Sequence, residues 1–256
     1  MAKHRVGLRP HLKTAKSIQI AKLATSKETP IQITVSTLKE ARYFFEHNIM
    51  DITYAVVILP GKLDEAASMI REGALLTIIV DNISSAIAIA DYAHIHNIVF
   101  RVLIEVDTGD KRSGVLSESM DLIQISKLLD NAKNIELKGV LTHAGHSYNC
   151  RTIPEIKVVA EEERIGITNA AKRLRTEGMP VSVVSAGSTP TAVHAQSLEG
   201  ITEMRPGVYM FNDLQQLALG ACTRKQLALS VLASVIGHSY QHGHLLLDAG
   251  VLALSK

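Results

Sequence analysis

The chain has 256 residues, of which 46% are hydrophobic and 20% are charged, and its formal net charge at pH 7 is +2. So apolar a composition excludes a disordered chain, and the modest glycine and proline content excludes a fibrous one. The near balance of charges indicates no nucleic-acid-binding surface, which needs clustered basic residues, and the length fits two small domains or one α/β barrel.

Short apolar runs rich in β-branched residues alternate along the chain with longer segments of helical spacing. The predicted strands cover residues 6–12, 31–35, 55–59, 75–80, 98–106, 137–141, 181–185 and 201–204. The predicted helices cover residues 15–24, 37–47, 62–72, 84–94, 117–129, 156–177 and 191–196. The long helix at 156–177 has typical end signals, since Pro154 suits a helix start and Gly178 a helix stop.

The strand runs are continuously apolar rather than alternating, which indicates strands buried on both faces in a parallel sheet covered by helices. Counting gives about eight strand–helix units, the number that closes a TIM-like (β/α)8 barrel. An open doubly wound sheet is the alternative, and periodicity does not separate the two. The sequence has no glycine-rich dinucleotide turn after the first predicted strand, which favours the barrel.

The end of the chain has a different pattern. Two largely apolar runs, 227–236 and 245–254, flank the polar segment 238–244, and no helical segment follows them. This pattern is typical of a pair of strands. We therefore expect residues 1–225 to form the barrel and residues 226–256 to be the incomplete start of a C-terminal β-rich domain.

Cysteine usage and the apolar stretches indicate the cellular setting. Cys150 and Cys222 lie far apart in sequence and match no metal-binding spacing, which suits a reducing compartment better than a disulfide scaffold. The longest apolar stretches are too short to cross a bilayer, and the first residues lack the apolar core of a secretory signal. We expect a cytoplasmic protein without a membrane or nucleic-acid partner.

In a barrel, chemistry collects at the carboxyl ends of the strands, where the loops converge. After the seventh predicted strand, Gly187 is followed by Ser188 and Thr189 at a helix start, where free N–H groups favour a phosphate. After the eighth, Gly207 offers an unobstructed backbone. Taken alone, each loop is better explained as a capped helix or an ordinary turn, because Ser, Thr and Gly are favoured there anyway.

Lys13 follows the first predicted strand, so its side chain would reach the mouth of a barrel. Desolvation there, with Arg9 or Arg112 nearby, would lower the pKa of its amine and leave it able to form a Schiff base. A phosphate cup with such a lysine across the mouth is what pyridoxal phosphate requires. A solvated loop lysine is the plain alternative.

Family resemblance separates these interpretations. The segment RPHLKTAK (residues 9–16) resembles the cofactor-lysine motif shared by D-serine dehydratases and D-threonine aldolases of the alanine-racemase-like fold, the fold-type III pyridoxal-phosphate enzymes. HAGHSY (143–148), GSTPTA (187–192) and RPGVY (205–209), followed by Phe211 and Asp213, resemble the dehydratase branch. DAG (248–250) and LALSK (252–256) resemble the strand that begins the family's second domain. The matching segments run in family order.

The resemblance implies pyridoxal 5′-phosphate as the cofactor and Lys13 as the catalytic, Schiff-base lysine. It implies a cofactor-binding set of Lys13, Arg112, His143, Tyr148, Ser188, Thr189, Arg205, Gly207 and Val208. Within this set, Arg112 would approach the phenolic oxygen, His143 would lie against the ring and Arg205 would reach the ring nitrogen.

Metal binding is expected from the family but not from residues of this sequence. An alternative interpretation is that histidines of this sequence bind zinc. The candidates are His143 with His146, and His238 with His242 and His244, but neither group completes a ligand set. In full-length relatives a His and Cys pair of the second domain binds zinc, and the sequence stops before that pair. Family members also begin with a strand and helix ahead of the lysine motif, whereas here Met1 lies just upstream. We interpret the sequence as a truncated family member, and the full-length protein is expected to be a homodimer.

The expected function is that of a pyridoxal-phosphate-dependent lyase on D-3-hydroxy amino acids, most like D-serine dehydratase, which converts D-serine to pyruvate and ammonia. Elimination of a β-hydroxyl needs a Lewis acid on the leaving oxygen, so we expect the activity to be impaired without the zinc site. The alternatives are a D-threonine aldolase, an amino-acid racemase, a non-catalytic barrel that binds pyridoxal phosphate, and a plain barrel with an inert Lys13.

Overall fold

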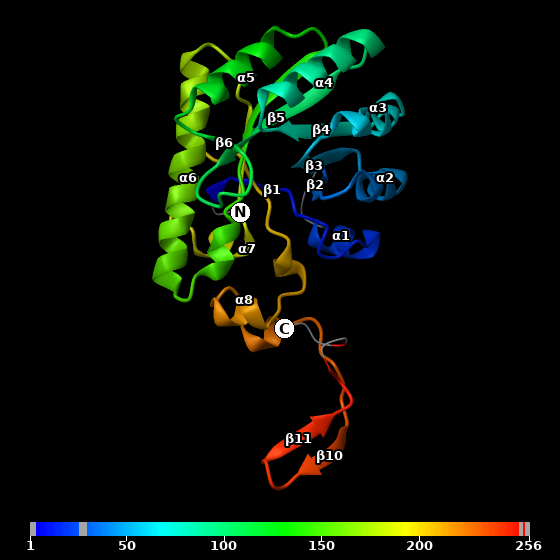
Figure 1. Cartoon of the computed structure of the whole chain (residues 1–256), viewed down its shortest axis with the longest axis vertical. Coiled ribbons are helices and arrows are strands. Elements are labelled where there is room, and N and C mark those ends of the chain that lie inside the picture. Colours follow the sequence, from blue (N-terminus) through cyan, green and yellow to red (C-terminus); the bar gives the residue numbers. More distant parts are fainter. Residues whose placement is uncertain (1–3, 26–29, 251–252, 254–256) are drawn as a thin grey trace.

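Parallel strands form the framework of the chain (Figure 1). The computed structural model describes residues 4–25, 30–250 and 253. The strands are β1 (Gly7–Leu8), β2 (Gln32–Val35), β3 (Asp51–Val57), β4 (Leu75–Val80), β5 (Phe100–Asp107), β7 (Ile135–Leu141), β8 (Val183–Ala186) and β9 (Glu203–Met204). They lie in the order β1-β9-β8-β7-β5-β4-β3-β2, and the short β6 (Val115–Leu116) pairs with the end of β5.

The two ends of this sheet meet and nearly close it into a barrel. β1 pairs with β9, while the residues that follow β1 reach β2 through a parallel bridge between His11 and Thr34. Thr34 N donates to Pro10 O at 2.9 Å, and Leu12 N donates to Thr34 O at 2.9 Å. The expected TIM-like barrel is therefore confirmed, and the open doubly wound alternative is wrong, because an open sheet would leave its first and last strands unpaired.

Helices surround the strands on the outside of the barrel (Figure 1). They are α1 (Ile18–Ala24), α2 (Leu38–Glu46), α3 (Leu63–Arg71), α4 (Ile83–His96), α5 (Met120–Asn131), α6 (Ile153–Thr176) and α7 (Thr189–His194). The short α8 (Leu214–Ala218) lies between the barrel and the end of the chain (Figure 1). α6 begins with a capping box in which Thr152 and Glu155 bond each other's backbone N–H groups. Its end is followed by Gly178 at a φ of 83°, which ends the helix as expected.

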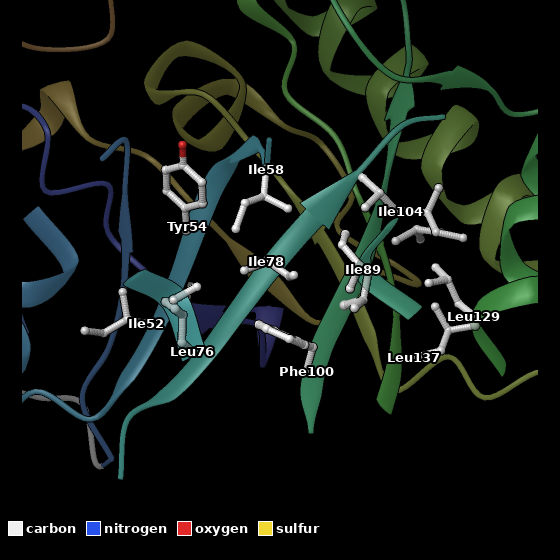
Figure 2. Packing of buried hydrophobic residues seen from close by; sticks show 14 of the residues in the cluster. Ile52, Tyr54, Ile58, Leu76, Ile78, Ile89, Phe100, Ile104, Leu129 and Leu137 are labelled. Atoms are coloured by element: carbon white, nitrogen blue, oxygen red, sulfur yellow. The ribbon is translucent and has the colours of Figure 1, made fainter. Parts of the chain in front are cut away.

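Apolar side chains of the strands pack against those of the helices (Figure 2). Ile52, Leu76 and Phe100 on β3, β4 and β5 are buried, as are Ile89 on α4 and Leu129 on α5. Full burial of one such side chain contributes roughly 1.5–3 kcal/mol to folding. This packing holds the strands rigidly, so that the loops after their carboxyl ends converge on one mouth.

Several boundaries differ from the predictions for local reasons. The strand predicted at 55–59 begins at Asp51, whose carboxylate is paired with Arg9 inside the barrel. The helix predicted from residue 15 begins at Ile18, since Lys16 adopts a left-handed conformation with a φ of 49°. The first strand, predicted at 6–12, is short because Pro10 has no N–H to continue the ladder. β6 and α8 were not predicted.

The C-terminal apolar runs form a hairpin, as their pattern predicts. β10 (Val235–Ser239) and β11 (His244–Leu247) pair antiparallel, and in Figure 1 this hairpin lies beyond the barrel. Both strands are shorter than the predicted runs 227–236 and 245–254. Residues 251–252 and 254–256, and with them most of the LALSK segment, lie outside the described residues. The division into domains at residues 225 and 226 stays a prediction.

Within the described part of the chain, no helix combines the length and apolar character needed to span a membrane.

Candidate active site

A cavity of about 390 Å³ opens at the carboxyl ends of the barrel strands. This volume is typical of small-molecule sites. Its walls come from the ends of β3, β5 and β7 and from the loops that follow other strands. The lining residues are His11, Lys13, Ser36, Ala55, Val56, Val57, Asp81, Glu105, Arg112, Ser113, Leu141, His143 and Arg205.

Lys13 lies in the tight turn that follows β1 and the bridge to β2. Ala15 N and Lys16 N both donate to Leu12 O, which fixes the turn around Lys13. Burial of the amine among the cavity walls lowers the pKa of Lys13, and the positive charge of Arg112 lowers it further. An amine with a lowered pKa is neutral more often at a given pH, so Lys13 has the properties of a nucleophile.

Arg112 reaches the cavity from the loop between β5 and β6. The carboxylate of Asp107 accepts hydrogen bonds from Gly109 N at 2.8 Å and Lys111 N at 3.0 Å, which fixes the start of this loop. Asp110 then forms an ion pair with Arg112 at 3.7 Å. The guanidinium is thus anchored at one side while it remains largely exposed toward the cavity.

His143 follows β7 and is partly buried. Its Nδ1 lies 3.3 Å from the carbonyl oxygen of Gly187, in the loop after β8. Burial lowers the pKa of His143 to about 3, and the charge of Arg205 adds to this effect. The imidazole is therefore neutral near pH 7, a flat and uncharged ring on the cavity wall.

Arg205 follows β9, lines the cavity and is otherwise buried. Its guanidinium donates to the hydroxyl of Ser185 at 2.5 Å and to the carbonyl oxygen of Thr142. Burial lowers the pKa of Arg205 to about 10, against the opposing effect of Glu203 and other carboxylates. Arg205 therefore carries a positive charge at neutral pH, in spite of its burial.

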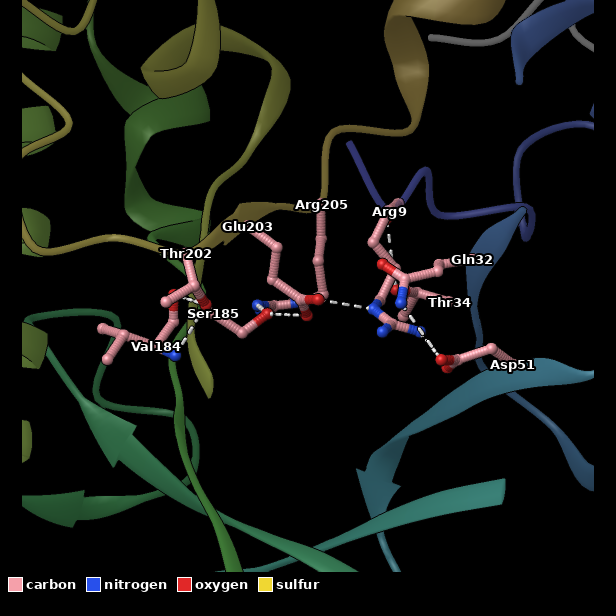
Figure 3. A network of polar contacts seen from close by, with 9 residues as sticks. All are labelled: Arg9, Gln32, Thr34, Asp51, Val184, Ser185, Thr202, Glu203 and Arg205. Atoms are coloured by element: carbon pink, nitrogen blue, oxygen red, sulfur yellow. Dashed lines mark hydrogen bonds and ion pairs between the residues drawn. The ribbon is translucent and has the colours of Figure 1, made fainter. Parts of the chain in front are cut away.

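The charge of Arg205 belongs to a network inside the barrel (Figure 3). Ser185 Oγ donates to Glu203 Oε1 at 2.5 Å, and Arg9 Nε donates to Glu203 Oε2 at 2.7 Å. Arg9 Nη1 in turn donates to Asp51 at 2.7 Å. Each buried charge thus has a partner of opposite sign or a hydrogen bond, as buried charges require.

One wall of the cavity is acidic. Glu105 at the end of β5 and Asp81 after β4 both line it. Burial raises the pKa of the Glu105 carboxyl, and the charge of Asp81 acts in the same direction, while a hydrogen bond with Ser113 opposes it. The cavity therefore presents cations and carboxylates together, which suits a zwitterionic ligand.

A second group of predicted residues lies beside the cavity without lining it: Tyr148, Ser188, Thr189, Gly207 and Val208. Thr189 Oγ1 accepts a hydrogen bond from Tyr209 N at 3.2 Å. Burial raises the pKa of Tyr148, and hydrogen bonds with Thr189 oppose that shift. The loops after β7, β8 and β9 thus meet at Thr189.

Ser188 is the N-cap residue of α7. Its hydroxyl lies 2.8 Å from that of Ser147 and 3.1 Å from that of Thr191, and it caps α7 by accepting from Thr191 N. The predicted role of Ser188 as a cofactor-binding residue stays a prediction.

Gly207 connects this second group with Lys13. A Cβ added to Gly207 would lie 2.7 Å from the carbonyl oxygen of His11 and 3.0 Å from Oγ1 of Thr14. His11 N also donates to Pro206 O at 3.0 Å. The lysine turn and the glycine loop are therefore in direct contact, and glycine is required at this approach.

The structure brings Lys13, Arg112, His143 and Arg205 together on one cavity, while their role in holding a cofactor stays a prediction. It adds residues to which the sequence assigned no role, among them His11, Asp81 and Glu105. Each of these lies at or just after the end of a strand, so their position along the chain could have indicated them. The described residues contain no group of three or more His, Cys, Asp or Glu that could hold a metal ion.

Comparison with known proteins gives matches along nearly the whole chain. Residues 1–215 match the family described as alanine racemase, N-terminal domain. The chain is 45% identical over 252 residues to a D-threo-3-hydroxyaspartate dehydratase from Delftia sp., covering 98% of this chain and 66% of that protein. It is 34% identical to a D-serine dehydratase from Dictyostelium discoideum, covering 98% of this chain and 67% of that protein.

Solved structures agree with these matches. The structure of the Delftia dehydratase has a TM-score of 0.94 and covers 100% of this chain and 67% of that chain. A mutant of the same enzyme in a metal-free form has a TM-score of 0.93, with 44% identity and the same coverage. The chain therefore spans about two thirds of the length of the curated relatives it matches.

Proposed function

Because the chain belongs to the alanine racemase N-terminal domain family, as its motifs led us to expect, we propose that it is the cofactor-binding barrel of a pyridoxal-phosphate-dependent lyase. The proposed substrates are D-3-hydroxy amino acids, and the proposed reaction is most like that of D-serine dehydratase. The observation that carries this proposal is the position of Lys13, whose amine has a lowered pKa and shares a cavity with Arg112, His143 and Arg205.

The residues of the cavity fit pyridoxal phosphate. The close approach of Gly207 to His11 brings the loop after β9 against the lysine turn, so that one bound molecule could contact both. Lys13 would hold the aldehyde carbon. Beside the cavity, Tyr148, Thr189 and the backbones of Gly207 and Val208 would hold the cofactor, and Ser188 would assist at the phosphate. Arg112 and Arg205 supply positive charge beside this group, and the neutral ring of His143 offers a flat surface for an aromatic ring.

When bound, pyridoxal phosphate would supply the electron sink that lets a proton leave the α-carbon of an amino acid. The residues of this chain then have separate tasks. Lys13 Nζ, with its lowered pKa, can take and hold a proton at moderate pH. Arg112 and Arg205 would face the phenolic oxygen and the ring nitrogen of the cofactor, as the resemblance implies, while Asp81 and Glu105 provide acceptors for the ammonium or hydroxyl group of an amino acid.

The choice of substrate rests on the relatives. The two relatives with the highest identity given above are named for D-threo-3-hydroxyaspartate and D-serine, which share a D-configured α-carbon and a hydroxyl on the neighbouring carbon. An aldolase is the second candidate, because the chain is also 26% identical to a 3-hydroxy-D-aspartate aldolase from Paracoccus denitrificans. The same cavity would then assist cleavage of the bond between the α- and β-carbons.

Zinc is part of the proposal for the complete reaction, on the strength of the family resemblance. The described residues form no metal site, so they do not fit a zinc ion by themselves. We propose that zinc, in the complete reaction, is bound by residues that are not part of this sequence.

The proposed partners are a small D-amino acid and, in the complete protein, a second copy in a homodimer. The proposed location is the cytoplasm. The two cysteines of the sequence are both free thiols in the structure, which is compatible with a reducing compartment.

The proposal is tested by adding pyridoxal phosphate to the purified chain and recording its visible absorption. We expect a band that is absent from the Lys13→Ala variant and present in Lys22→Ala, which removes an exposed lysine of α1. If the unmodified chain and Lys13→Ala give the same spectrum, the proposal is wrong.

Turnover then separates the candidate functions. D-Serine and D-threo-3-hydroxyaspartate are each supplied with and without zinc, and the products are measured. A keto acid with ammonia indicates a dehydratase, while glycine with an aldehyde indicates an aldolase. A Lys13-dependent band with no product at any zinc concentration indicates a barrel that binds the cofactor without turnover.

A further inference from the structure

Glu163 is a buried carboxylate in α6 that reaches two loops of the cavity. It is 2% exposed, and its Oε1 accepts hydrogen bonds from Ala144 N at 3.0 Å and from Gly187 N at 2.9 Å. Ala144 belongs to the loop after β7, and Gly187 belongs to the loop after β8. A single side-chain oxygen of α6 thus connects two loops, through residues 144 and 187, which are 43 positions apart in the sequence.

These two loops carry predicted cofactor-binding residues. Ala144 directly follows His143, and Gly187 directly precedes Ser188 and Thr189. The carbonyl oxygen of Gly187 also lies 3.3 Å from His143 Nδ1. Glu163 therefore acts at the point where the histidine meets the loop proposed to hold the phosphate.

The local backbone explains why a side chain is needed there. Gly187 has a φ of 108°, and a Cβ on it would lie 2.8 Å from the methyl group of Met204, so only glycine fits. The N–H of Gly187 is buried. Leaving a buried N–H without a hydrogen-bond acceptor costs free energy of folding. Glu163 supplies that acceptor from α6.

Two opposing effects act on the pKa of the Glu163 carboxyl. Burial raises the pKa of its carboxyl, while the hydrogen bonds from Gly187, Thr191 and Ala144 and the charge of Arg205 oppose the shift. A carboxyl oxygen accepts hydrogen bonds in either protonation state. The tie between the two loops therefore does not depend on the charge of Glu163.

We propose that Glu163 is a positioning residue that sets the place of His143 and of the Gly187–Thr189 segment for the bound cofactor. This inference rests on the proposed function, because it assigns Glu163 a task toward pyridoxal phosphate. Glu163 lines no part of the cavity and acts through the two backbone N–H groups that it binds.

The experiment compares four forms of the chain with wild type. Glu163→Ala removes the acceptor, Glu163→Asp shortens it by one carbon, and Glu163→Gln keeps an oxygen at the same reach. Glu162→Ala is the matched control, since Glu162 is the exposed neighbour on the same helix. For each form, pyridoxal phosphate is titrated, and the absorption and circular dichroism of the visible band are recorded at saturation.

We expect Glu163→Ala and Glu163→Asp to bind pyridoxal phosphate at least about tenfold more weakly, because each loses hydrogen bonds to a charged or polar acceptor. We expect their visible circular dichroism to change at saturation, since His143 would no longer be held. Glu163→Gln is expected to restore both the affinity and the spectrum, and Glu162→Ala to match wild type. If Glu163→Ala does not fold, Glu163→Asp and Glu163→Gln decide the question.

A second measurement needs no cofactor. Hydrogen exchange of the Ala144 and Gly187 amides in the cofactor-free chain is expected to be faster in Glu163→Asp and normal in Glu163→Gln. A lower melting temperature with unchanged affinity and spectrum would mean that Glu163 is only structural and would overturn the inference. If the unmodified chain lacks a Lys13-dependent band, the proposed function fails instead, and the exchange result stands apart from it.

Discussion

The guanidinium of Arg205 donates to the hydroxyl of Ser185 at 2.5 Å inside the barrel. The same hydroxyl donates to Glu203, so one serine transmits the negative charge of a buried carboxylate to a buried cation of the cavity. Arg205 can remain charged at the cavity wall because this connection offsets the loss of its hydration.

Replacing Ser185 by Ala is therefore expected to destabilise the chain and weaken the site. Glu203 loses a donor and Arg205 an acceptor, and leaving such groups unsatisfied costs about 1–3 kcal/mol. Urea unfolding measures the loss, and titration with pyridoxal phosphate measures the weaker binding. Ser84→Ala, which changes an exposed serine of α4, is the control. Equal stability of the two variants would contradict the role of Ser185.

The lowered pKa of Lys13 predicts how cofactor binding depends on pH. Only the neutral amine reacts, so the rate of band formation should rise with pH around a midpoint below the ordinary lysine pKa. Burial is the main cause of the shift, and Arg112 is the second. The variant Arg112→Gln removes a like charge, which raises the Lys13 pKa and moves the midpoint to higher pH. Stopped-flow absorption at a series of pH values measures it.

Lys111→Gln is the matched control for that experiment, since Lys111 precedes Arg112 in the loop but does not line the cavity. An equal shift in both variants would mean that general charge, rather than the position of Arg112, sets the midpoint.

The contact between Gly207 and the lysine turn predicts a strong effect of a single methyl group. In Gly207→Ala the new Cβ would lie 2.7 Å from the backbone oxygen of His11, so the two loops must separate. Overpacking of this kind costs about 1–3 kcal/mol, and affinity for pyridoxal phosphate should fall as well. Thermal unfolding and cofactor titration measure the two effects.

Gly61→Ala is the comparison, because a Cβ at Gly61 meets nothing within 4 Å. Should Gly207→Ala bind the cofactor as tightly as Gly61→Ala, the glycine loop is not part of the site.

The lowered pKa of His143 predicts that the free energy of unfolding decreases in acid. Its pKa in the folded chain is about 3, below the ordinary value of 6.5, so the unfolded chain binds a proton at a pH where the folded chain does not. The stabilising effect of the neutral ring is present above about pH 6.5 and is lost as the pH falls toward 3. His143→Gln should make the decrease in stability shallower by up to about 1.4 kcal/mol per pH unit.

Unfolding by urea between pH 7 and 4 measures this slope. His11 also has a pKa well below its ordinary value because of burial, so a residual slope should remain. His94→Gln, at an exposed position of α4, serves as the control. An unchanged slope in His143→Gln would contradict the lowered pKa of His143, since a group with the same pKa in the folded and unfolded chain adds nothing to the slope.

Much of the fold could be predicted because its signals are local. The run at 75–80 is a strand with the predicted bounds, since Leu76, Ile78 and Val80 are all buried and β-branched or aliphatic. The start of β3 could not be predicted, because Asp51 is placed in a strand by its ion pair with Arg9, 42 positions away. Charged residues with distant partners have no signal in the sequence near them.

The site shows the same division. Lys13, Arg112, His143 and Arg205 follow ends of strands, and the rule that such ends converge was enough to bring them together. The arrangement of Ser188 depends on Ser147, 41 residues away, and that contact was not predictable from its helix-start position alone. The contacts of Glu163 were equally unpredictable. Helical periodicity indicates which face of α6 is buried, but it does not indicate that the N–H groups of Ala144 and Gly187 bind there.

A single bridge between His11 and Thr34 connects the residues after β1 to β2, just before Lys13, so the ring of strands is weakly joined at this place. Neighbouring pairs such as β5 and β7 are instead joined along most of their length. On the other side, β1 pairs with β9 at only two positions. A molecule bound to Lys13 and to the loop after β9 would connect these two strands and so strengthen this short part of the ring. Ligand binding and barrel closure are then thermodynamically linked, and the stabilisation of the closed barrel would grow with the logarithm of the free ligand concentration over its dissociation constant.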